Sequence, residues 1–207
     1  NSGIMAFGTQ IGNQEDFEGI PGKGSSSGIE GAYMLRVMST IESILGNKDE
    51  AEKYALESKL AIDAVYKKLF LKDVGRFAWY EDLSGQMRLD PAYHSICYPI
   101  NYGMMEDEAM VSSIDHLINR LSGPDGEVFI SNHFGGHAHN GVATWGMQCG
   151  ANNQPVATLA YSKLGMGNQA IWPLKFIADI VCHRQAGSFL ETAREGFKSY
   201  FTPAACM

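Results

Sequence analysis

The residues best suited to chemistry lie in a glycine-rich stretch in the second half of the chain. It holds three histidines and an asparagine within eight residues, followed by a tryptophan: His133, His137, His139, Asn140 and Trp145. Imidazole and amide groups donate and accept hydrogen bonds to hydroxyls, and an indole face packs against the apolar side of a pyranose. The stretch therefore predicts a sugar-binding loop. The competing interpretation is a glycine-rich loop whose histidines satisfy backbone groups.

The same histidines have an H-x-x-x-H-x-H spacing that could supply imidazoles to a metal ion. A structural or catalytic metal needs three or four converging ligands. No nearby cysteine or pair of carboxylates completes such a set, so we expect no metal site.

Three acidic residues near the beginning of the chain, Glu15, Asp16 and Glu18, are the candidate catalytic carboxylates. They lie in a long polar loop rich in glycine, which would face a pocket at the loop end of a helical array. The alternative is that they are solvated loop acids. A second acidic run, Glu106 to Glu108, opens a predicted helix and is interpreted as helix capping.

Three further residues extend the predicted binding surface. Trp79 and Tyr80 lie in a second long connection and could continue the aromatic platform, or they could belong to a hairpin that covers the end of the helical array. His94 lies near the start of a predicted buried helix, where its N-terminus would point at the pocket. It could equally be a core histidine with satisfied hydrogen bonds.

The elements that position these residues follow from an internal repeat. Gly46, Gly103 and Gly165 are 57 and 62 residues apart, and each is followed by a few polar or small residues and then by an amphipathic run. Glycine takes the left-handed conformation that ends many helices at little cost. Each glycine therefore predicts a tight turn between two helices, with Asp49, Asp107 and Asn168 as caps of the next helix.

Three helical hairpins are predicted, at about 27–70, 92–121 and 152–184, within a single domain that covers residues 1–207. The first helix of each hairpin carries few charges, and the second is amphipathic. Short links then lie at one end of the array and long loops at the other. This is the organisation of an all-α fold, an α/α toroid, with about three of six hairpins present. A small β-hairpin is predicted where 76–81 and 86–89 flank a turn at 82–85.

Composition excludes several classes of function. The net charge of −7 disfavours nucleic acid and anionic membrane surfaces, and no window of eighteen apolar residues predicts a membrane span. No phosphate loop, dinucleotide fingerprint, Gly-x-Ser-x-Gly or His-Glu-x-x-His motif occurs, so no cofactor is expected. The four cysteines are widely spaced and are interpreted as free thiols, which mildly favours a reducing compartment without fixing the localisation.

The repeat resembles the six-hairpin, (α/α)6-barrel glycoside hydrolases, and most closely the bacterial α-L-rhamnosidase-like families, over about residues 25–184. The residues that carry the resemblance are turn glycines and packing positions: Gly31-Ala32-Tyr33, Leu45-Gly46, the run from Asp49 to Tyr54, Phe70, Gly75-Arg76-Phe77, the run from Tyr98 to Met104, Leu159-Ala160-Tyr161 and Leu164-Gly165. The resemblance implies a sugar pocket at the long-loop end and a pair of carboxyl groups that act as acid and as base or nucleophile. In such families the acid usually lies N-terminal to this region and the second carboxyl C-terminal to it, and neither motif has a clear copy here.

We therefore expect a glycoside hydrolase-like domain that cleaves or binds saccharides, with a catalytic pair that the fragment need not contain. Whether the chain by itself is an enzyme stays open. A non-catalytic helical-repeat binding module and another sugar-active toroid enzyme, an epimerase or a lyase, are the alternatives. Since half a toroid leaves the flanks of its inner helices uncovered, we expect self-association or a missing remainder of the same chain.

Overall fold

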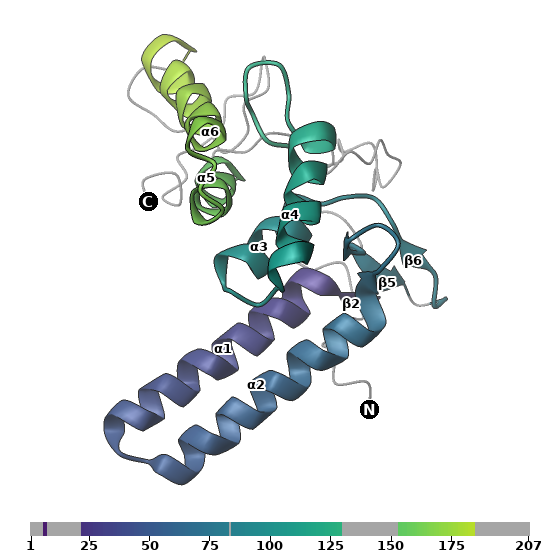
Figure 1. Cartoon of the computed structure of the whole chain (residues 1–207), viewed down its shortest axis with the longest axis vertical. Helices are drawn as coiled ribbons and strands as arrows, with labels where there is room; N and C mark the ends of the chain where they lie inside the picture. The colour runs from purple at the N-terminus through teal and green to yellow at the C-terminus, as the bar shows by residue number, and fades with distance from the viewer. Residues whose placement is uncertain (1–5, 8–21, 83, 130–152, 185–207) are drawn as a thin grey trace.

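The fold consists of three helical hairpins in a row (Figure 1). The structure is a computed structural model that describes residues 6–7, 22–82, 84–129 and 153–184. The helices in this part of the chain are α1 (Ser25–Leu45), α2 (Lys48–Leu69), α3 (Tyr93–Asn101), α4 (Asp107–His116), α5 (Asn153–Lys163) and α6 (Gly167–Asp179). Two π-helical turns, η1 (Leu117–Leu121) and η3 (Ile180–Arg184), extend α4 and α6.

The first helices of the three hairpins form an inner row in which α3 packs between α1 and α5. The ring of Tyr33 on α1 stacks on Tyr102 at the end of α3, with 4.2 Å between centroids. On the other side, Asn101 Nδ2 donates to the carbonyl of Val156 on α5 at 2.9 Å. The predicted fold class, an α/α toroid of helical hairpins with small β-hairpins, is confirmed.

All three predicted glycine turns are present. Gly46, Gly103 and Gly165 have φ values of 85°, 61° and 70°. In each link the glycine N–H donates to the carbonyl three residues back at 3.0–3.2 Å, and the next N–H donates to the carbonyl five residues back at 2.8–2.9 Å. These two bonds satisfy the last carbonyls of the helix and reverse the chain.

The predicted side-chain caps are wrong. The residues at the N-cap positions are Asn47, Glu106 and Met166, and none of them makes a side-chain cap hydrogen bond. The acids Asp49 and Asp107 lie in the first turns of α2 and α4, where their charge suits the helix dipole. Asn168 lies inside the first turn of α6. The first hairpin begins slightly earlier than predicted, because α1 starts at Ser25 after Gly24 and not at about residue 27.

The core lies between the inner row and its outer partners. The largest fully buried side chains come from all three hairpins and the strands between them: Ile29, Leu69, Phe77, Ile96, Ile100, Leu117, Leu121 and Tyr161. Nearly every side chain of α3 is buried because it has neighbours on both flanks. The outer helix α2 has a charged, exposed face as predicted, but α6 exposes Ile171, Trp172 and Leu174. The exposed face of the second helix is therefore partly apolar in the third hairpin.

Short strands lie between the first two hairpins. The predicted hairpin is present as β5 (Tyr80–Asp82) paired with β6 (Met87–Arg88), and Asp82 Oδ1 accepts the N–H groups of Ser84 and Gln86 in its turn. The prediction that 76–77 belongs to the same hairpin is wrong, because this segment is β4 (Arg76–Phe77) and pairs instead with β3 (Phe70–Leu71). The strands β1 (Ala6–Phe7) and β2 (Gly22–Gly24), in a region predicted to be loop, extend the sheet to the order β1-β2-β5-β6.

The left-handed turn predicts a matched pair of glycine substitutions. An added Cβ meets no atom within 4 Å at Gly165 or at Gly167, but only Gly165 has a positive φ. We expect Gly165→Ala to lower the free energy of unfolding by about 1 kcal/mol because alanine is strained there. Gly167→Ala is expected to be neutral or stabilising by up to about 1 kcal/mol, since it removes backbone entropy within a helix. Urea unfolding of both variants checks this, and equal losses would contradict it.

Candidate functional site

The N-termini of the inner helices lie at the end of the array opposite the three short links. α1 begins at Ser25, α3 at Tyr93 and α5 at Asn153, and each follows a long connection. A buried polar layer runs through these first turns; it consists of Ser25, Ser26, Ser27, His94, Ser95, Asn153 and Gln154. Buried polar side chains at convergent helix N-termini are typical of binding sites for hydroxylated or anionic ligands. This is the predicted sugar-binding end.

Ser25 joins three segments of this polar layer. Its Oγ donates to the carbonyl of Trp79 at 3.0 Å and shares a 2.8 Å hydrogen bond with Ser95 Oγ. Its backbone N–H donates to the same carbonyl at 3.1 Å. All of these groups are buried, so each bond replaces a contact with water. The start of α1, the residue that precedes β5 and the start of α3 are thereby held together.

Trp79 and Tyr80, the predicted aromatic platform, lie beside this junction. Their rings meet edge to face with 5.6 Å between centroids, and together with Ala92 they form a small buried cluster. Only 3% of Trp79 and 5% of Tyr80 is exposed. Their stacking on a sugar stays a prediction, and so does the alternative that they belong to a hairpin that covers the end of the array.

His94 lies in the first turn of α3 and is buried against two tyrosines. Its ring centroid is 3.7 Å from that of Tyr93 and 5.3 Å from that of Tyr98. Burial lowers the pKa of His94 to about 3. The imidazole is therefore neutral at physiological pH and can donate or accept a hydrogen bond, but it does not carry charge.

The remaining predicted site residues lie outside the described part of the chain. They are Glu15, Asp16, Glu18, His133, His137, His139, Asn140 and Trp145. Among the described residues, no three His, Cys, Asp or Glu side chains are grouped as metal ligands, and no helix is long and apolar enough to cross a membrane.

Sequence reasoning missed a carboxylate next to the polar layer. Glu127 is buried, its Oε2 accepts the N–H of Asp125 at 3.0 Å, and its carboxylate covers Gly123 so closely that a Cβ there would lie 2.0 Å from Oε1. Glu127 directly precedes Val128. The side-chain amide of Gln154 accepts a hydrogen bond from the N–H of Val128 at 2.8 Å and donates one to its carbonyl oxygen at 3.0 Å. The signal available in the sequence was that Glu127 shares its loop with only one other acidic residue.

Glu81 is the second buried carboxylate among the described residues, and its role is structural. It lies 2.7 Å from Lys68 Nζ on α2 and 3.1 Å from Lys23 Nζ next to it in the sheet. The hydrogen bond from Lys68, with further help from Lys23, holds the pKa of Glu81 below its usual value. The ionised carboxylate of Glu81 connects the sheet to the first hairpin through these two lysines. Because it stays ionised, it is unsuited to donate a proton.

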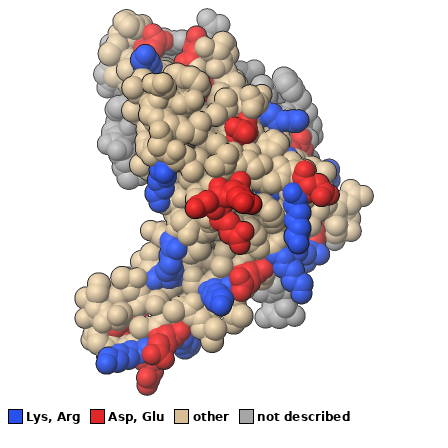
Figure 2. Space-filling model, viewed as in Figure 1, with Lys and Arg blue, Asp and Glu red and all other residues tan. Residues whose placement is uncertain are grey.

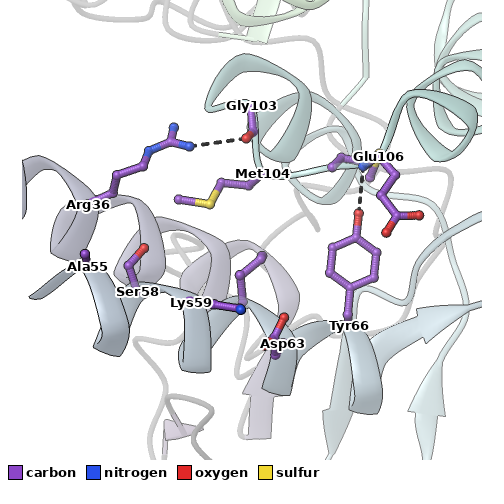
Figure 3. A pocket seen from close by; sticks show the side chains of 11 residues that line it. Arg36, Ala55, Ser58, Lys59, Asp63, Tyr66, Gly103, Met104 and Glu106 are labelled. Atoms are coloured by element: carbon purple, nitrogen blue, oxygen red, sulfur yellow. Dashed lines mark hydrogen bonds between the residues drawn. The ribbon is translucent and has the colours of Figure 1, made fainter. Parts of the chain in front are cut away.

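An open groove of about 650 Å³ lies at the short-link end, away from the predicted site (Figure 3). It forms because α1 and α2 extend beyond the shorter α3: 21 residues in α1 against 9 in α3 correspond to about 31 and 14 Å. Arg36 Nη1 donates to the carbonyl of Gly103 at 3.2 Å, and the Tyr66 hydroxyl accepts the N–H of Glu106 at 3.1 Å. The polar groups of the groove thus hold the second link against the first hairpin.

The burial of His94 predicts a specific dependence of stability on pH. An unfolded histidine binds a proton near pH 6.5, and the folded one does so only near 3, so the folded state loses stability as the pH falls through this window. The loss is at most roughly 5 kcal/mol. We expect His94→Gln to flatten the profile between pH 6.5 and 3 in urea unfolding. His183→Gln, which removes an exposed histidine, is the control; an unchanged slope for His94→Gln would contradict the prediction.

Comparison with known proteins finds similar folds among solved structures, but no similar sequence. No protein-family model and no curated protein sequence matches the chain. Among solved structures, the GH78 family rhamnosidase of Bacillus sp. GL1 is similar over 93% of this chain, with a TM-score of 0.68 and 12% identity. The neutral trehalase Nth1 of Saccharomyces cerevisiae is similar over 78% of this chain, with a TM-score of 0.64 and 9% identity.

A third similar structure is the GH63 mannosylglycerate hydrolase of Thermus thermophilus in complex with Tris, which covers 82% of this chain with a TM-score of 0.60 and 8% identity. The chain spans 18% of the rhamnosidase, 32% of the trehalase and 40% of the mannosylglycerate hydrolase. The chain therefore has an α/α-toroid fold and matches a part of each of these structures.

Proposed function

We propose that this chain is a glycoside hydrolase-like domain that binds saccharides at the N-termini of its inner helices. The observation that carries the proposal is the similarity of its three hairpins to three sugar hydrolases, at TM-scores of 0.60 to 0.68. Fold alone does not determine function. The buried polar layer at the first turns of α1, α3 and α5 adds independent support, because it supplies hydroxyl and amide groups at one end of the array.

Cleavage of a glycosidic bond needs two carboxyl groups, one to protonate the leaving oxygen and one to activate water or attack the sugar. The candidates in this chain are the acids of the first loop, Glu15, Asp16 and Glu18, with Glu127 added by the structure. Glu127 is suited to the role by its burial and by its place beside α5. A pair that lies in further parts of a longer protein remains the alternative assignment.

A non-catalytic binding or scaffold module is the second candidate. The observation that favours it is that Trp79, Tyr80 and His94, the predicted binding residues that the structure describes, are all buried. A domain of this kind would use its long loops to contact a partner without converging carboxylates. An epimerase or lyase on the same fold would need its own acid and base pair at the loop end.

Saccharide binding provides the first test. The chain is titrated by calorimetry with L-rhamnose, trehalose and mannosylglycerate, which are chosen to match the enzyme names of the similar structures. We expect saturable binding of at least one, with a Kd of roughly 1 mM, and a loss of about tenfold in affinity for Trp145→Ala or His137→Ala. Leu56→Ala, an exposed apolar residue on α2, is the control. Absence of binding, or an equal effect of Leu56→Ala, would count against the proposal.

Cleavage is tested separately with aryl glycosides of the same sugars. Replacing a catalytic carboxylate by its amide is expected to lower kcat by about a hundredfold or more, because the amide neither gives up nor accepts the proton. Glu15→Gln, Asp16→Asn, Glu18→Gln and Glu127→Gln are compared with Glu50→Gln, an exposed acid on α2. A chain that binds sugar without cleaving it would support either the non-catalytic binding module or a catalytic pair in further parts of a longer protein.

A further inference from the structure

The open groove at the short-link end runs along α2 and has opposite charges at its two ends. Its wall on α2 extends from Ala55 to Tyr66, which is 66 − 55 = 11 residues or about 16 Å along the helix axis. Figure 2 shows basic and acidic side chains next to each other where the α1–α2 hairpin meets the rest of the molecule. In order along the groove, Figure 3 shows the charged side chains of Arg36, Lys59, Asp63 and Glu106.

Between the charged ends the lining of the groove is apolar. Met104 and Met105, in the link after α3, are each 8% exposed, and Ile62 on α2 is half-buried. The unbranched thioether side chain of methionine is flexible and adapts to ligands of different shapes. The volume of about 650 Å³ lies within the usual range of ligand sites. The middle of the groove can therefore hold an apolar side chain.

Some polar groups of the groove serve the fold, and others remain available to a ligand. Arg36 donates to two carbonyls at the end of α3 and keeps its positive charge. The Tyr66 hydroxyl accepts the N–H of Glu106, so its own proton is left to donate. Within the described residues, no hydrogen bond or ion pair engages the Lys59 ammonium or the carboxylates of Asp63 and Glu106. One cation and two carboxylates thus line the groove without a partner.

An extended peptide segment matches this arrangement. Alternate side chains of an extended segment point to the same side, and positions i, i+2 and i+4 span about 13 Å. The groove is about 16 Å long and presents a cationic end, an apolar middle and an acidic end in that order. An acidic, an apolar and a basic residue at these three positions would each meet a complementary group.

We propose that this groove binds an extended segment of a partner protein in which an acidic and a basic residue flank an apolar residue at alternate positions. The acidic side chain pairs with Lys59 and Arg36, and the basic one lies between Asp63 and Glu106. The apolar side chain packs on Met104. The inference is independent of the proposed sugar chemistry, because the groove lies at the opposite end of the helical array from the predicted sugar site.

Calorimetric titration of the purified chain with capped pentapeptides tests the proposal. Acetyl-ESLSK-amide is expected to bind with a Kd of roughly 100 µM. The peptides ESLSE, KSLSK and ESSSK each lose one of the three contacts, so each is expected to bind at least about fivefold more weakly. Tightest binding of KSLSK would indicate simple attraction to the net charge of −7 and would overturn the proposal. Equal binding of all four peptides, or no binding at about 2 mM, would overturn it as well.

Reversing the charge at the acidic end provides the matched test. Asp63→Lys combined with Glu106→Lys makes both ends cationic, so ESLSK is expected to lose at least about tenfold in affinity and ESLSE to become the tightest of the four peptides.

The control for this variant is Glu52→Lys combined with Glu57→Lys, which changes the net charge by the same amount. Both residues are exposed on α2 and lie outside the groove. This control is expected to change the Kd of ESLSK less than about twofold, because charges away from the site are screened by salt. Circular dichroism confirms that both double variants are folded. An equal loss in the control, or a groove variant that still binds ESLSK best, would contradict the proposal.

Discussion

The left-handed glycine turn is the constraint on which the structure depends. At Gly46, Gly103 and Gly165 the same pair of hydrogen bonds ends an inner helix and sends the chain back along an outer one. Only glycine takes this φ without strain, so the position of each glycine fixes the length of the inner helix that precedes it. All inner helices then run in one direction, and every long connection returns to the same end.

That parallel arrangement creates the candidate site. The first turns of α1, α3 and α5 bring serines, a histidine, an asparagine and a glutamine to one end, and the bonds from Ser25 and Gln154 tie them to the connecting segments. Glu81 connects the small sheet to α2 through its two lysines. The groove near Tyr66 and Glu106 arises separately, because the first hairpin is longer than the second. The two ends of the molecule thus differ in chemistry for a topological reason.

The unequal surroundings of the three hairpins have a further consequence. α3 is buried on both flanks, while α1 and α5 each have one flank without a neighbour among the described residues. A similar fold occurs in a rhamnosidase and a trehalase, of which this chain spans only a fraction. A row of hairpins gains stability mainly from contacts between adjacent units, so its terminal units are the weakest and the most open to association.

The sequence by itself determined the hairpins and their glycine turns. These depend on local patterns: helical periodicity, a glycine at the end of each inner helix and uncharged first helices. Only the tertiary structure decided that Trp79, Tyr80 and His94 are buried, that 76–77 pairs with 70–71, and that Glu127 lies beside Gln154. Ser25 and Ser95 are 70 residues apart. Contacts at such separations depend on how the helices pack, and no local pattern encodes them.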